Sequence, residues 1–157
     1  MASPAFLSPV LSDRIRAGLP VGLLGGAVSA GALIGLGLRH GAATYPFEIG
    51  GRALFASWRL GIPSTAVALL AGIVAHLLWM ELWGVCFSAV ATSLRGGTLL
   101  VGAALFALFL GALSATVVPG ALGAAAFAAL SPVQTAFLLA LLAGAFIAGV
   151  VLVRDWR

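Results

Sequence analysis

Apolar residues fill four long segments of the chain, which are separated by prolines, glycines and arginines. The segments cover residues 17–38, 62–93, 97–118 and 132–153. A membrane-spanning helix needs roughly 20 mostly apolar residues, so each segment is predicted to cross a bilayer. The pattern therefore predicts an all-α integral membrane protein, a four-helix bundle that forms a single membrane domain over residues 1–157.

Two of the four segments carry further information about their ends. A helix over the whole of 62–93 would be nearly 50 Å long, against a hydrocarbon core of about 30 Å. It is therefore expected to tilt or to project beyond the lipid. The start of 132–153 is marked by Ser131, Pro132 and Gln134, which fit a capping residue, a first helical position and a capping-box partner.

The more polar stretches predict short helices at the membrane surface. We expect interfacial segments at about 3–16, 47–60 and 119–130. In the second of these, Glu48 and Arg52 are four residues apart, which allows a helical ion pair. Apolar bulk from Phe55 and Trp58 makes this segment amphipathic, as expected of a helix in the headgroup region.

Composition supports the membrane interpretation. The chain is 62% hydrophobic and 8% charged, whereas soluble domains average about 25% charged residues. All eight basic residues are arginines, and they are scattered over the ends of the segments instead of clustering on one face. Nucleic-acid binding needs such a cluster, so no nucleic-acid partner is expected. The lone Cys86 can form no internal disulfide.

The arginines also predict an orientation. The N-terminus, the 94–97 loop and the C-terminus share one side of a four-span topology and carry five arginines, against three on the other side. The positive-inside rule then places both termini in the cytoplasm. Abundant Ala, Gly, Leu and Arg, with no lysine, are typical of a GC-rich bacterial genome. We expect a multi-pass protein of a bacterial inner membrane.

Small residues recur at four-residue spacing on every span. In lipid, such rows mark faces where helices pack closely. The chain is therefore expected to pack tightly, within itself or against other membrane subunits or copies of itself. The packing positions predicted from these rows are Gly22, Gly26, Gly72, Gly84, Gly111 and Gly144.

His76 and Glu81 are the candidate functional residues, because ionisable groups within membrane spans are functional candidates by default. They are five residues apart, which separates them by about 140° around a helix, so they do not bond each other. If Trp79 and Trp83 mark an aromatic belt, Glu81 lies at headgroup level. If the span centres near residue 77, Glu81 lies deep and needs a proton or a partner. Gln134 is a candidate partner for Glu81 along a polar path.

The stretch "GIVAHLLWMELW" around His76 resembles the purple-bacterial light-harvesting polypeptides. The small Gly72 lies four residues before His76, and Trp79 and Trp83 follow. This local resemblance implies that His76 is an axial ligand of bacteriochlorophyll or haem. The alternative is a structural role, in which a neutral imidazole forms a hydrogen bond with a neighbouring helix. The only other histidine, His40, lies too far along the chain to flank one haem with His76.

Over nearly its whole length, the chain resembles the small four-span YagU-like bacterial membrane proteins. The matching stretches are "AGIVAHLLWMELWG", Gly102 with Gly111, and "VVPGALG". This resemblance implies a fold and a location but no activity. Three hypotheses follow: a non-catalytic accessory or scaffolding subunit, a pigment- or haem-binding subunit that uses His76, and a small transporter or channel that uses Glu81 and His76. No enzymatic site is expected.

Overall fold

The computed structural model describes residues 9–39, 41–91, 93–122 and 131–155, and these form five α-helices and no strand. The prediction of an all-α fold is confirmed. The helices are α1 (Pro9–Arg39), α2 (Tyr45–Ser57), α3 (Thr65–Ala91), α4 (Gly96–Leu122) and α6 (Pro132–Asp155).

Four of these helices are long and apolar enough to cross a membrane. The qualifying stretches are Ile15–Arg39, Thr65–Ala91, Gly96–Ser114 and Pro132–Arg154. They correspond one for one to the four predicted spans, which confirms a multi-span helical membrane protein. At most 33% of each apolar window is buried inside the protein, as expected of helices whose solvent is lipid.

The boundaries differ from the predicted ones by up to three residues at most helix ends, so that α3 (Thr65–Ala91) is shorter than the predicted 62–93. The two largest differences lie in α1 and α4. Residues 9–16, predicted as part of a surface segment, are the first turns of α1 and continue into the span without a break. The helix α4 runs to Leu122, four residues beyond the predicted end of its segment. Residues 3–8 and 123–130 of the predicted surface segments lie outside the described part of the chain.

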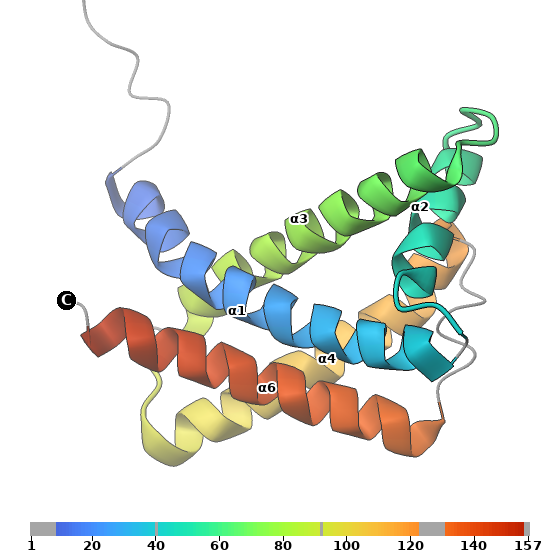
Figure 1. Cartoon of the computed structure of the whole chain (residues 1–157). Coiled ribbons are helices and arrows are strands. Elements are labelled where there is room, and N and C mark those ends of the chain that lie inside the picture. The colour runs from blue at the N-terminus through green and yellow to red at the C-terminus, as the bar shows by residue number, and fades with distance from the viewer. Residues whose placement is uncertain (1–8, 40, 92, 123–130, 156–157) are drawn as a thin grey trace, which may run out of the picture.

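The long helices α1 and α3 cross near one end and diverge toward the other (Figure 1). The short helix α2 packs against α3 on the diverging side and also touches α1 and α4. On its other face, α1 packs against α6, and α6 packs against α4. The four spans therefore enclose one core, and α2 covers one end of it.

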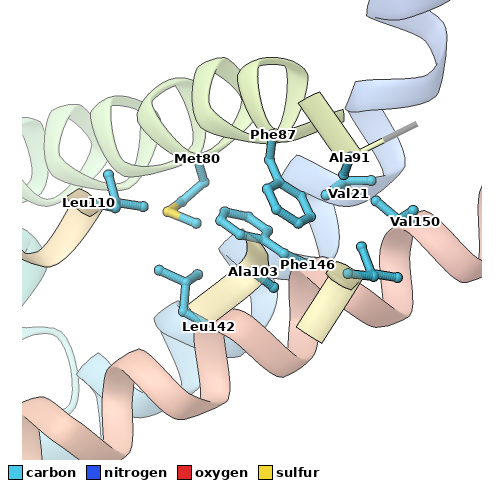
Figure 2. Close-up of a cluster of buried hydrophobic side chains, with 10 residues drawn as sticks. Val21, Met80, Phe87, Ala91, Ala103, Leu110, Leu142, Phe146 and Val150 are labelled. Atoms are coloured by element: carbon cyan, nitrogen blue, oxygen red, sulfur yellow. The ribbon is translucent and has the colours of Figure 1, made fainter. Parts of the chain in front are cut away.

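The core is built from aromatic and aliphatic side chains of all four spans (Figure 2). Phe87 of α3 stacks on Phe146 of α6, with ring centroids 5.2 Å apart. Phe106 of α4 lies edge-on to Phe146 at 5.7 Å. Val21 of α1 is fully buried beside them. Offset and edge-to-face arrangements are the favoured ones for aromatic pairs, so the cluster stabilises the packing of the four spans against one another.

Two local predictions about polar residues are confirmed. The Ser131 amide donates to Gln134 Oε1 at 2.8 Å, and the Gln134 amide donates to Ser131 Oγ at 3.3 Å, which is the capping box expected at the start of α6. In α2, Arg52 forms an ion pair with Glu48 at 2.9 Å. Arg52 also donates to Thr65 Oγ1 at 3.0 Å, so the pair ties α2 to the first turn of α3.

Candidate functional site

Glycines bring the backbones of α1 and α3 into direct contact along a seam that holds both candidate residues. A methyl group added at Gly84 would overlap the backbone of Gly22. One added at Gly18 would overlap the backbone of Val85. Only glycine permits such an approach. The seam is therefore dry and tight, and polar side chains within it must find partners among the neighbouring atoms.

His76 lies where α1, α2 and α3 meet. Its Nε2 is 3.1 Å from Ser29 Oγ and 3.3 Å from the Gly26 carbonyl oxygen. The Ser29 hydroxyl donates to the Gly25 carbonyl oxygen at 2.7 Å. The ring of Phe47, from α2, lies edge-on to the imidazole with centroids 5.6 Å apart.

These contacts assign the hydrogen of the imidazole. The Gly26 carbonyl can only accept, and the Ser29 hydroxyl already donates its hydrogen to Gly25. Nε2 therefore carries the hydrogen and donates it toward α1. A nitrogen in this state is not free to ligate a metal, so an axial bond to bacteriochlorophyll or haem from Nε2 would require α1 to move away from His76.

Glu81 faces the same seam five residues, about 1.4 turns, further along α3. A methyl group at Gly22 would lie 2.7 Å from Glu81 Oε2, so this oxygen is pressed against α1. Oε2 is buried and has no hydrogen-bond partner among the described residues. Both candidate residues thus contact α1, although they lie about 140° apart around α3. This is possible because the backbones of the two helices are so close that side chains on either side of the contact line reach α1.

The geometry of α3 bears on the two depths expected for Glu81. Glu81 is three residues from the midpoint of α3 (Thr65–Ala91), about 4.5 Å along its axis. Trp79 and Trp83 pack edge-on to each other, and Trp83 packs against Phe106 and Phe109 of α4. The two indoles therefore serve helix packing at mid-span and do not mark the end of the helix.

Gln134 is not brought near Glu81. Its side chain is engaged in the capping box at the first turn of α6. Further along the same helix, Gly149 lies against Val21, the neighbour of Gly22. Fifteen residues separate Gln134 from Gly149, about 22 Å of helix. The structure therefore does not join Gln134 and Glu81 in one polar path.

Most of the predicted packing glycines lie against another helix. Gly72 faces the backbone of Phe47 in α2, and Gly26 faces Met80 in α3. A methyl group at Gly111 would lie 2.8 Å from the Leu139 side chain of α6. Gly144 differs, because a methyl group there would meet nothing within 4 Å.

Gly144 opens into a groove between α1 and α6 with a volume of about 460 Å³. The groove is lined almost wholly by apolar atoms, and the small residues Ala140 and Ala148 continue the row on either side of Gly144. Leu24 and Val28 of α1 form the opposite wall. Sequence spacing indicated that this row is a packing face but could not indicate that it lies open.

Another hollow of about 600 Å³ lies between α4 and α6 and reaches Pro132. This end adjoins residues 123–130, which lie outside the described part of the chain. The candidate site consists of the seam and the α1/α6 groove.

Two polar contacts that stabilise the bundle have no signal in the residue spacing. Ser29 of α1 is the partner of His76, 47 residues away along the chain. Arg154 Nη2 donates to the carbonyl oxygens of Ala91 and Leu94, both at 2.6 Å. This places a cation on the C-terminal end of α3, where the helix dipole favours positive charge. Neither contact joins residues close in sequence, so spacing could not reveal them.

The described residues limit the chemistry that is available. No three His, Cys, Asp or Glu side chains within the described ranges lie close enough together to hold a metal ion. His40 lies outside those ranges. Comparison with models of known protein families, with curated proteins and with solved structures found no match.

Proposed function

We propose that the protein is a non-catalytic accessory subunit of a membrane complex, and that a membrane-spanning helix of a partner subunit occupies the α1/α6 groove. The carrying observation is the open space at Gly144. The bilayer offers no hydrophobic drive for helix association, so close packing through small residues supplies the affinity. An exposed row of Ala140, Gly144 and Ala148 is suited to that packing.

The groove continues along α1. Ala27, Gly31 and Gly35 are exposed, and a methyl group at either glycine would meet nothing within 4 Å. By helical periodicity these residues share a face with Leu24 and Val28, which line the groove. Small residues of two helices therefore form one surface, long enough to receive several turns of a third helix.

The hollow shape favours a partner helix over a second copy of the same surface. A two-fold contact sets the same patch of each subunit against itself. Two grooves facing each other would leave a void that lipid or other atoms must fill, whereas a single convex helix fills one groove directly. A partner with small residues at four-residue spacing would approach most closely.

The pigment hypothesis has less support, because the hydrogen on Nε2 of His76 is donated to α1. The transporter hypothesis has less support, because Gln134 is about 22 Å along α6 from the level of Gly22. The bacterial inner membrane and cytoplasmic termini remain proposals, supported by the distribution of arginines. The resemblance to YagU-like proteins is compatible with this location.

The test is purification from native membranes in mild detergent with a tag on the chain. At both Gly144 and Gly97 an added Cβ would meet nothing within 4 Å, so Gly144→Leu directs a leucine into the groove and Gly97→Leu is the matched substitution on α4. We expect one polypeptide to be retained by the wild type and by Gly97→Leu, and to fall at least about tenfold with Gly144→Leu, a change of about 1.4 kcal/mol in binding. Equal retention by the two variants, or a wild-type chain that purifies alone, would contradict the proposal.

A further inference from the structure

We infer that Glu81 is a proton-binding site inside the membrane, held as a neutral carboxylic acid against the backbone of α1. This inference is independent of the proposed partner helix. It rests on the position of one carboxyl oxygen, on the charges around it and on its depth in the span.

At the position of Oε2, the negative charge of a carboxylate would have no hydrogen-bond donor or cation to stabilise it. The oxygen is buried at the crossing of α1 and α3 and accepts no hydrogen bond from any described residue. Its neighbour across the seam is Gly22, whose backbone is engaged within α1. A buried carboxylate is stable only when charges or hydrogen-bond donors compensate it, and the seam supplies neither to Oε2.

No described cation lies close to this carboxyl from α1 or α6. On α1, Arg16 precedes Gly22 by six residues, about 9 Å along the axis toward the end of the helix, and its side chain is exposed. On α6, Arg154 bonds the carbonyl of Ala91, which is ten residues and about 15 Å beyond Glu81 along α3.

The remaining neighbours supply no charge either. The helix α4 carries no ionisable residue. On α2, Arg52 pairs with Glu48 and bonds Thr65, about 24 Å along α3 from Glu81. Within α3, His76 and Cys86 are each five residues from Glu81, about 140° around the helix, and the imidazole donates to α1.

Depth makes the ionised form still less favourable. Glu81 lies about 4.5 Å along the axis from the middle of a span of 27 residues, far from either end. With the bilayer centred on α3, the part of its side chain that the protein leaves uncovered faces hydrocarbon and not water. A group in that position adopts its neutral form unless a partner charge reaches it.

Infrared spectroscopy of the purified full chain in lipid tests the inference directly. The sequence holds only four carboxyl side chains, so their bands can be assigned by substitution. At neutral pH we expect the carbonyl stretch of a protonated carboxylic acid, shifted downward in heavy water. The band should be lost in Glu81→Gln and retained in Glu48→Gln, which removes the ion-paired surface carboxyl. The absence of the band in the wild type, or its persistence in Glu81→Gln, would overturn the inference.

A membrane-soluble carbodiimide gives an independent chemical test. The reagent takes the proton of an un-ionised carboxyl onto nitrogen while the carboxyl oxygen bonds its central carbon, and an oxygen-to-nitrogen acyl shift then gives a stable N-acylurea. Mass spectrometry of the peptides should show addition of one reagent molecule at Glu81 and none at Glu48. Reaction at Glu48 with none at Glu81, alongside no acid band in the infrared spectrum, would show that Glu81 is ionised.

Discussion

The closest approach of α1 and α3 leads to a quantitative prediction for Gly22→Ala. The added methyl carbon would lie 2.7 Å from Glu81 Cα and 2.9 Å from the Met80 carbonyl oxygen, both backbone atoms that cannot turn aside. Ordinary contact begins at 3.4 Å, so α1 and α3 must separate by about 0.7 Å. Overpacking of this kind typically costs about 1–3 kcal/mol.

Gly31→Ala is the matched control for this substitution. Gly31 lies on the same helix, and a methyl group there meets nothing within 4 Å. Both variants gain the same intrinsic preference of alanine for helix, up to about 1 kcal/mol. The difference between them therefore isolates the cost of the clash, which we expect to be about 1–3 kcal/mol.

The assay is reversible unfolding by sodium dodecyl sulfate in mixed micelles, followed by circular dichroism. We expect Gly22→Ala to unfold at a lower detergent fraction than the wild type, and Gly31→Ala to unfold at or above the wild-type value. If the two variants unfold together, the backbones of α1 and α3 are not in contact at Gly22, and the seam described above is wrong.

Three further predictions concern single contacts. Gly72→Ala should push α2 away from α3 and speed amide exchange in α2, measured by mass spectrometry, whereas Gly50→Ala, which meets open space, should not. Arg154→Gln should lower the free energy of unfolding by about 1 kcal/mol in the same detergent titration, because the C-terminal carbonyls of α3 lose a cation. His76→Ala should lower the free energy of unfolding by about 0.6–1.7 kcal/mol, because the hydrogen bond to Ser29 is lost. Replacing Ser29 by alanine as well should lower it little further, because the two residues share one bond.

Features that depend on neighbours in the sequence could be predicted. The capping box of Ser131 and Gln134 and the ion pair of Glu48 and Arg52 each join residues three or four apart, so helical geometry alone brings them together. The four spans follow from apolar length, which the bilayer thickness imposes on any crossing helix.

Features that depend on which helix lies opposite could not be predicted. The row spacing indicated that Gly22, Gly84 and Gly144 are packing positions, but it could not show that the first two meet each other while the third lies open. The sequence left two depths open for Glu81, and the shallow one depended on two tryptophans, because indoles favour the membrane surface. An indole suits an aromatic core equally well, and Trp83 packs against α4.

The most direct test of the account is photo-crosslinking from the α1/α6 groove in native membranes. A photoreactive amino acid at Ala148 would lie within the groove, and one at Val101 of α4 would face outward with 58% of the side chain exposed. We expect the probe at Ala148 to give an adduct with one further polypeptide and the probe at Val101 to give lipid adducts. Lipid adducts alone from both positions would contradict a subunit role for this groove.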